Sequence, residues 1–218
     1  MIKADHKKWA RRVYDFYEPW LLKSNFQNFY LINDFPQIPA NEGLIITPNH
    51  FSWWDGFFID YTLRFFSSRK IYILMLEEQL KRYWFFQKVG AFSINPQNPK
   101  SIKETLDYIS EVVSDPNNVL LFYPQGEIDD YAKRPLKVKD GLKTILNMSP
   151  AIVNILPVAF KIKHGNTKKP DILVRFGDLI SSYKAKTDFN FFIAGFNSNI
   201  DLLDKELSNN YKDNLFTR

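Results

Sequence analysis

Two short segments of this 218-residue chain carry side chains that could do chemistry. In the first, residues 47–55, His50 is followed five positions later by Asp55. A neutral imidazole that donates one ring N–H to a carboxylate can accept a proton at its other nitrogen, which makes it a general base. The second, residues 122–127, contains a proline and a glycine that would let main-chain amides approach a ligand. Both segments directly follow apolar runs, so we expect them to form one active site.

The spacing of His50 and Asp55 restricts how the two side chains can meet. On a continuous helix, residues five apart point roughly 140° away from each other. Contact therefore requires His50 to precede a helix and Asp55 to lie in its first turn, and Pro48 and Asn49 suit such a non-helical entry. The alternative is a surface histidine unrelated to a carboxylate that stabilises a helix N-terminus.

Apolar segments alternate with helical ones from residue 43 onward, and these elements would position the two loops. We expect strands at 43–47, 70–76, 91–95, 119–123, 152–163 and 171–176, and helices at 54–66, 78–89, 99–114, 136–147 and 201–211. This alternation predicts an α/β fold with a mixed, largely parallel sheet flanked by helices. Pro157 lies inside an expected strand, which predicts an edge or a bulge there.

The first 35 residues combine aromatic and basic residues at mostly helical spacings, interrupted at Pro19. This pattern predicts an N-terminal amphipathic helical hairpin. Aromatic rings at the headgroup level beside cations that meet anionic lipid are typical of a helix in a membrane interface. We therefore divide the chain into a membrane-association segment, residues 1–35, and an α/β domain, residues 36–218. The alternative is a hairpin that only packs onto its own domain.

Composition excludes several classes of function. The chain has no cysteine, which excludes disulfides, thiolate nucleophiles and cysteine-ligated zinc. The three histidines, His6, His50 and His164, are far apart, so we expect no histidine-rich metal site. The formal charge of +5 implies attraction to an anionic partner, which could be nucleic acid, a membrane surface or a phosphorylated cofactor. An aromatic content of 17% suits a protein that contacts lipid or an apolar substrate. No recognition helix or RNA-binding pattern is present, so we expect no nucleic-acid partner.

The chain contains no apolar run of roughly eighteen residues or more and no secretory signal. These two observations predict a peripheral protein on the cytoplasmic face of the inner or plasma membrane.

Four blocks of the chain together resemble the glycerolipid acyltransferase family of the lysophosphatidate type. That family shows N-H-x-x-x-x-D, a G-x-x-F-I-D-R-like block, F-P-E-G-T-R and a V-P-V-like strand, in this order. Asn49, His50 and Asp55 match the first block completely, and residues 156–158 match the fourth. Residues 90–95 and 122–127 match the second and third in part. The resemblance extends from about residue 40 to residue 165, which is most of the chain.

The resemblance implies transfer of a fatty acyl group from acyl-CoA or acyl-carrier protein to a hydroxyl of a lipid-like acceptor, with no cofactor. His50 would act as the general base and Asp55 would orient it. The acceptor or oxyanion region would comprise Asn49, Pro124, Gln125, Gly126 and Glu127. Lys133, Arg134, Lys137 and Lys139 are candidates to contact the donor or a phosphate, and the alternative is that they form a solvated basic face.

The chain departs from the family where two arginines are thought to bind the phosphate of the acceptor. Those places read Asn95-Pro96 and Glu127-Ile128-Asp129-Asp130 here. Because close like charges repel by roughly a kilocalorie per mole or more, we expect an acceptor that is not a simple phosphate monoester. The alternatives are a lysophosphatidate acyltransferase of phospholipid synthesis, a thioesterase in which the dyad activates water, and a non-catalytic lipid-binding relative.

Overall fold

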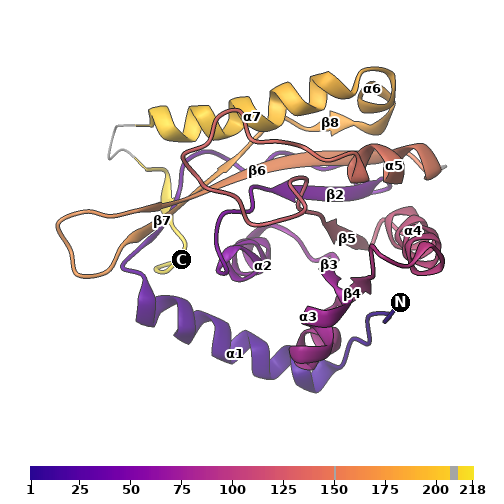
Figure 1. Cartoon of the computed structure of the whole chain (residues 1–218). Coiled ribbons are helices and arrows are strands. Elements are labelled where there is room, and N and C mark those ends of the chain that lie inside the picture. Colours follow the sequence, from indigo (N-terminus) through magenta and orange to yellow (C-terminus); the bar gives the residue numbers. More distant parts are fainter. Residues whose placement is uncertain (150, 207–210) are drawn as a thin grey trace.

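The computed structural model describes residues 1–218 except residue 150 and residues 207–210. Within the described residues, a nine-stranded sheet has the order β4-β3-β5-β2-β6-β7-β1-β9, and β8 pairs with β6 (Figure 1). The strands are β1 Phe29–Leu31, β2 Gly43–Pro48, β3 Lys70–Leu76, β4 Ala91–Ile94, β5 Asn118–Leu121, β6 Val153–Lys163, β7 Asp171–Phe176, β8 Ile180–Ser181 and β9 Asp213–Asn214. The helices are α1 Lys8–Asn25, α2 Asp55–Phe66, α3 Glu77–Arg82, the 3₁₀ helix η1 Trp84–Val89, α4 Pro99–Ser114, α5 Gly141–Met148, α6 Ser182–Thr187 and α7 Phe189–Lys205.

The sheet is mixed and largely parallel, which confirms the fold class predicted from the sequence. β2 pairs in parallel with both β5 and β6, and β3 pairs in parallel with β4 and β5. Antiparallel pairing occurs between β6 and β7, between β6 and β8, and between β1 and β9. All six residues of β2 are buried, as expected for a central parallel strand that helices cover on both faces.

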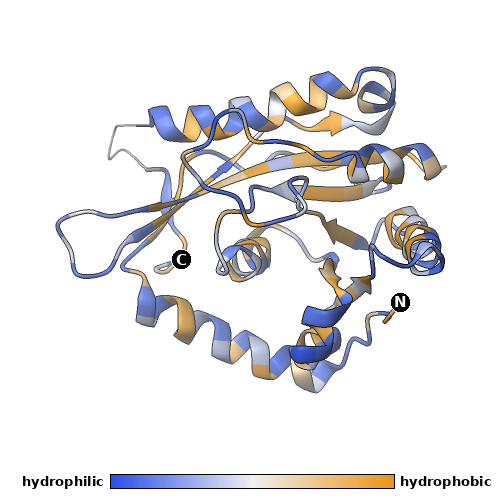
Figure 2. Ribbon diagram, in the orientation of Figure 1, coloured by the Kyte–Doolittle hydropathy of each residue, from blue (hydrophilic) through white to orange (hydrophobic). Residues whose placement is uncertain are grey.

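Two hydrophobic clusters lie on opposite faces of the sheet. Leu44 and Ile46 of β2 contribute to the first cluster, together with residues of α1 and α2. Ile45, which points to the other face, belongs to the second cluster with residues of α4, α5 and α7. Figure 1 shows α7 and α1 on opposite sides of the sheet, and Figure 2 shows hydrophobic colouring concentrated in the central strands.

The N-terminal segment is a single helix, α1, and the predicted hairpin is wrong in this respect. Pro19 lies inside α1, where it cannot donate a hydrogen bond to the carbonyl oxygen of Asp15. That oxygen instead accepts a bond of 2.9 Å from the guanidinium of Arg64 in α2. A tertiary contact thus satisfies the group that the proline leaves free, and the helix continues.

Residues 1–35 are continuous with the rest of the fold. Strand β1 pairs with β7, and Leu22, Phe26 and Phe29 are buried in the same cluster as α2. The sheet and its core therefore cross the boundary that we expected at residue 35.

Four other elements differ from the prediction. The helix expected over residues 78–89 is divided into α3 and the 3₁₀ helix η1. The helix expected over residues 136–147 begins at Gly141, because residues 136–140 form an extended loop. The helix expected over residues 201–211 is α7, which begins at Phe189 and ends at Lys205; residues 207–210 lie outside the described residues. Pro157 lies in an interior strand, at the point where β6 exchanges one partner, β8, for another, β7. Pro157 is therefore accommodated where the antiparallel pairing of β6 is interrupted, and not at an edge of the sheet.

Candidate functional site

The two candidate loops leave the sheet side by side. β2 ends at Pro48 and β5 ends at Leu121, and these parallel strands are neighbours, with Ile46 opposite Leu121. The loop after β2 carries His50, and the loop after β5 is residues 122–127, called here the Gln125 loop. Because the carboxyl ends of parallel strands meet at one edge, the topology alone brings these loops together.

His50 and Asp55 are in direct contact. The Nδ1 atom of His50 lies 2.8 Å from Oδ2 of Asp55. His50 precedes α2 and Asp55 is the first residue of α2, which is the arrangement that their spacing requires. An ionised carboxylate only accepts hydrogen bonds, so Nδ1 donates and Nε2 is left with its lone pair. The His50 side chain is 23% exposed, so it can be reached from solvent.

The Asp55 carboxylate is fully buried, and its two oxygens have different surroundings. Oδ2 accepts hydrogen bonds from the backbone amides of Phe51 at 2.8 Å and Ser52 at 2.9 Å, in addition to His50. Oδ1 has no hydrogen-bond partner among the described residues. Burial raises the pKa of Asp55, and the bond from His50 and those from the two amides oppose this rise. The carboxylate therefore fixes both the imidazole and the main chain around it.

Tyr123 covers the other side of the imidazole. Its ring stacks on that of His50, with centroids 4.3 Å apart and planes inclined by 27°. The hydroxyl oxygen of Tyr123 is buried and has no hydrogen-bond partner among the described residues. The sequence analysis did not single out Tyr123 as a site residue. Its place directly after β5, at the same sheet edge as His50, was the available signal.

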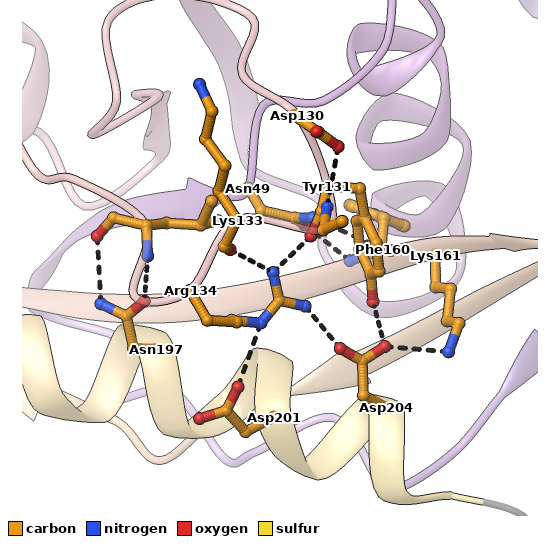
Figure 3. A network of polar contacts seen from close by, with 12 residues as sticks. Asn49, Asp130, Tyr131, Lys133, Arg134, Phe160, Lys161, Asn197, Asp201 and Asp204 are labelled. Atoms are coloured by element: carbon orange, nitrogen blue, oxygen red, sulfur yellow. Dashed lines mark hydrogen bonds and ion pairs between the residues drawn. The ribbon is translucent and has the colours of Figure 1, made fainter.

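Side-chain amides fix the main chain of both loops. Gln125 accepts a bond of 2.6 Å from the His50 amide and donates one of 3.1 Å to the His50 carbonyl. Asn49 makes the same pair of bonds with the main chain of Phe160, at 2.7 and 3.0 Å (Figure 3). We call this arrangement, in which one amide bonds both N–H and C=O of one residue, an amide clamp. Asn49 and Gln125 are buried, and their amides contact main chain.

The remaining members of the Gln125 loop form a turn whose polar groups are already bonded. Gly126 has a positive φ of 71°, which favours glycine, and its amide donates to the carbonyl of Tyr123 at 3.0 Å. The carbonyl of Pro124 accepts from the amide of Lys139 at 2.9 Å. Glu127 is exposed and pairs with the Lys139 ammonium at 2.8 Å. The Gly126 amide is thus bonded within the turn in this conformation.

Three of the four cations expected to contact donor or phosphate are paired with carboxylates. Lys133 pairs with Asp129 at 2.5 Å, and Lys139 pairs with Glu127. Arg134 bonds Asp201 at 3.1 Å and Asp204 at 2.5 Å, which joins its loop to α7 (Figure 3). Lys137 is exposed, and within the described part of the chain it has no ion pair.

A groove of about 410 Å³ lies beside the Gln125 loop. It is lined by Gln125, Glu127, Asp129, Pro135, Leu136, Lys137, Val138, Lys139 and Ile193. Gln125 connects the groove to the main chain of His50, but neither His50 nor Asp55 lines it. The pKa values of Glu127 and Asp129 are lowered by hydrogen bonds from Lys139 and Lys133, so both carboxylates are ionised at neutral pH. Lys137 is the unpaired cation of this lining within the described residues.

Two features are absent from the described residues. These residues contain no cluster of three histidine, aspartate or glutamate side chains arranged to hold a metal ion. They also contain no helix with the length and hydropathy needed to cross a bilayer.

Comparisons with known proteins agree on the family. A 1-acyl-sn-glycerol-3-phosphate acyltransferase of Streptococcus pneumoniae (strain ATCC BAA-255 / R6) is 27% identical over 124 residues, which are 55% of this chain and 42% of that protein. The chain thus spans less than half the length of this curated relative. The crystal structure of the 1-acyl-sn-glycerophosphate (LPA) acyltransferase PlsC from Thermotoga maritima shares the fold. Its TM-score is 0.63 at 14% identity, over 91% of this chain and 81% of that one. The Acyltransferase family model matches residues 31–161, more than half of the sequence and all of the site, so the chain belongs to the acyltransferase family.

Proposed function

We propose that this protein transfers a fatty acyl group from an acyl thioester, acyl-CoA or acyl-carrier protein, to a hydroxyl of a lipid-like acceptor. The observation that carries the proposal is the 2.8 Å contact between His50 Nδ1 and a buried Asp55 carboxylate, which leaves Nε2 as a proton acceptor. Membership of the acyltransferase family supports it.

The proposed reaction uses the pair as a general base and then as a general acid. Nε2 of His50 takes the proton of the acceptor hydroxyl while its oxygen attacks the thioester carbonyl carbon. The negative charge of Asp55 stabilises the imidazolium that forms. The tetrahedral intermediate then collapses, the C–S bond breaks, and the thiolate takes the proton from His50. Ester and thiol are the products, and neither a metal ion nor a covalent acyl-enzyme takes part.

We infer that the acceptor is not a simple phosphate monoester. The place of one family arginine is held by Asn95, and the place of the other lies in the Glu127–Asp130 segment. Three of the four nearby cations are engaged with carboxylates, so a phosphate would have to displace those ion pairs. A neutral or zwitterionic headgroup avoids that cost.

Lysophosphatidate is the second candidate acceptor, and Lys137 favours it. This cation is exposed in the groove beside the Gln125 loop, and the curated relative is named for a 1-acylglycerol phosphate acceptor. If the phosphate binds there, Lys137→Ala should raise the KM for lysophosphatidate and leave the KM for a neutral acceptor unchanged.

We also propose that the protein attaches peripherally to an anionic membrane, at its cytoplasmic face, through α1. Trp9, Phe16 and Trp20 are 54%, 84% and 62% exposed. Aromatic contacts then run from Trp9 to Phe85 and, beside it, from Phe86 through Phe57 to Trp53, which is itself exposed. Trp53 lies three residues after His50. These rings would give an acyl chain an apolar approach from the lipid to the site.

The first prediction tests the reaction. Radiolabelled acyl-CoA and acyl-carrier protein are incubated with a total lipid extract and with wild-type protein, His50→Ala or His164→Ala. We expect a labelled lipid from the wild type and from His164→Ala, which changes an exposed histidine, and a loss of roughly 10² to 10⁴ in rate for His50→Ala.

The other outcomes separate the alternatives. Label released only as free fatty acid would support a thioesterase. Consumption of neither donor, with lipid still bound, would support a non-catalytic lipid-binding protein and would contradict the proposal.

A further inference from the structure

Two buried polar atoms lie next to the His50–Asp55 pair without a partner. One is Oδ1 of Asp55, which can only accept a hydrogen bond while the carboxylate is ionised. The other is the hydroxyl of Tyr123, which can donate one. Buried polar groups in folded proteins are nearly always hydrogen-bonded, so an unpaired acceptor and an unpaired donor at one site require an explanation.

The ring of Tyr123 packs against the imidazole that Asp55 bonds. The two rings stack at 4.3 Å, and the imidazole is bonded to Asp55 at 2.8 Å. The charge of Asp55 contributes to the raised pKa of Tyr123, after burial, so the two groups interact electrostatically. Within the described residues, His50 and Tyr123 are the titratable side chains found against Asp55.

We propose that Tyr123 is the third member of the site: its hydroxyl is linked to Oδ1 of Asp55 through one buried water and so positions the carboxylate against His50. Oδ2 is held by three hydrogen bonds, and a bond at Oδ1 would fix the rotation of the carboxylate as well. Tyr123 is a positioning residue, because it acts through Asp55. In the family block stated above, phenylalanine precedes the proline, so the hydroxyl is an addition in this chain.

The hydroxyl should also adjust the strength of the base. A hydrogen bond from the water that Tyr123 holds withdraws charge from the Asp55 carboxylate, which weakens its attraction for the protonated imidazole. When the hydroxyl is removed, the carboxylate attracts the imidazolium more strongly, and His50 should hold its proton to higher pH.

The deciding experiment is a titration of the histidine ring signals by NMR in Tyr123→Phe, which keeps the stacked ring. We expect the His50 signals to change at higher pH than in the wild type, while the signals of His6 and His164 are the same in both proteins. His50→Gln assigns the signal. Tyr61→Phe is the matched control, since it removes a buried hydroxyl that bonds Leu215 far from the dyad.

Thermal unfolding gives a second, independent readout. If the hydroxyl is linked to Asp55 through the water, Tyr123→Phe should lower Tm, and the decrease should shrink in the Asp55→Asn background. If the hydroxyl is truly unpaired, its removal should leave Tm unchanged or raise it. An unchanged His50 midpoint together with an unchanged or higher Tm would overturn the proposal.

Of the three readouts, the kinetic one is the readout that depends on the proposed acyl transfer. There we expect Tyr123→Phe to lower kcat about three- to tenfold at neutral pH with an unchanged KM for the acceptor. A change in KM alone would mean that the hydroxyl binds substrate and would contradict a positioning role. If no acyl transfer is found at all, the NMR and unfolding results still decide whether Tyr123 is coupled to Asp55.

Discussion

At the scale of single residues, the Gln125 loop positions the base. Tyr123 stacks on the imidazole of His50, and Gln125 holds the N–H and C=O of the same residue. The amide of Asp129 adds a further bond to the His50 carbonyl at 3.0 Å. Residues that follow β5 thus converge on a histidine that follows β2.

The chemistry of the clamp explains why glutamine replaces the glutamate of the family pattern. A side-chain amide offers both a donor and an acceptor, whereas a carboxylate offers only acceptors. Gln125→Glu would therefore keep the bond to the His50 N–H but place a carboxylate against the His50 carbonyl.

We predict that Gln125→Glu destabilises the protein by about 1 to 3 kcal/mol at neutral pH, because a buried bond is lost and two acceptors face each other. Thermal unfolding measures the change in stability. The destabilisation should diminish at low pH, where a protonated glutamate can donate a hydrogen bond to the His50 carbonyl. Glu127→Gln, which changes the neighbouring exposed carboxylate of the same loop, should have little effect. Equal stability of Gln125→Glu and wild type would show that the clamp does not contribute.

At the scale of elements, α1 is attached to α2 by a partly exposed ionic network around the buried Glu18. Arg11 makes a bidentate contact with Asp60 at 2.7 and 2.8 Å, and Arg64 contacts Glu18 at 2.5 Å and Asp15 at 3.0 Å. Three carboxylates therefore share two guanidinium groups. Glu18 is fully buried, and its pKa is raised well above the usual value, first by burial and then by the charge of Asp60. A protonated Glu18 leaves the network neutral.

Because three carboxylates share two guanidinium groups, the effect of Glu18→Gln on stability should depend on pH. A carboxyl whose pKa is raised in the folded state favours folding when protonated, so its contribution falls as pH rises above about 4.5, by about 1.4 kcal/mol per unit up to the folded pKa. Glutamine cannot ionise. The Tm of Glu18→Gln relative to wild type should therefore increase between pH 5 and pH 8.

The matched control is Glu78→Gln on the exposed side of α3, for which the Tm difference should not depend on pH. A Glu18→Gln protein that is less stable than wild type at pH 8 would show that the ion pair with Arg64 outweighs the cost of burying the charge.

The strands and helices differ in how far they could be predicted from the sequence. The strands around the site were predictable because buried parallel strands read as apolar runs, and the His50–Asp55 contact followed from their spacing. The helix was expected to break at Pro19. It continues because Arg64, forty-five residues away, bonds the carbonyl oxygen that the proline leaves free. The start of α7 was missed because Gly195, Asn197 and Asn199 are poor helix formers, and burial of Phe192, Phe196 and Ile200 overrides them.

At the scale of the whole molecule, α1 presents to solvent the kind of residues that helices usually bury. Trp9, Val13, Phe16 and Trp20 recur at intervals of three and four and so share one exposed face. Ala10, Tyr14, Glu18 and Leu22 lie on the opposite, buried face. Lys8, Arg12 and Lys23 are exposed beside the aromatic face. The arrangement fits a helix that lies in the interface of an anionic bilayer.

We predict that the combined substitution Trp9→Gln, Phe16→Gln and Trp20→Gln reduces binding to anionic vesicles by roughly tenfold or more, because it removes the apolar surface that enters the lipid. Flotation with vesicles of phosphatidylglycerol and phosphatidylcholine measures this. Point substitutions are needed, since deletion of residues 1–35 would also remove β1 and part of the core.

The control changes exposed aromatic residues on the other side of the sheet, Tyr183→Gln in α6 and Phe191→Gln in α7 (Figure 1). This pair should float like the wild type. If both variants float equally well, α1 is not the membrane contact.

The amide clamps also affect how prolonged heating would inactivate the protein. Asn49, Gln125 and Asn197, which bonds the amide and carbonyl of Leu136, are buried and hold the loops around the site. Asparagine and glutamine are among the thermolabile residues, and hydrolysis of one such amide leaves a carboxylate beside a main-chain carbonyl. Prolonged heating would then inactivate molecules that still refold, by a covalent change that adds one negative charge and that cooling cannot reverse.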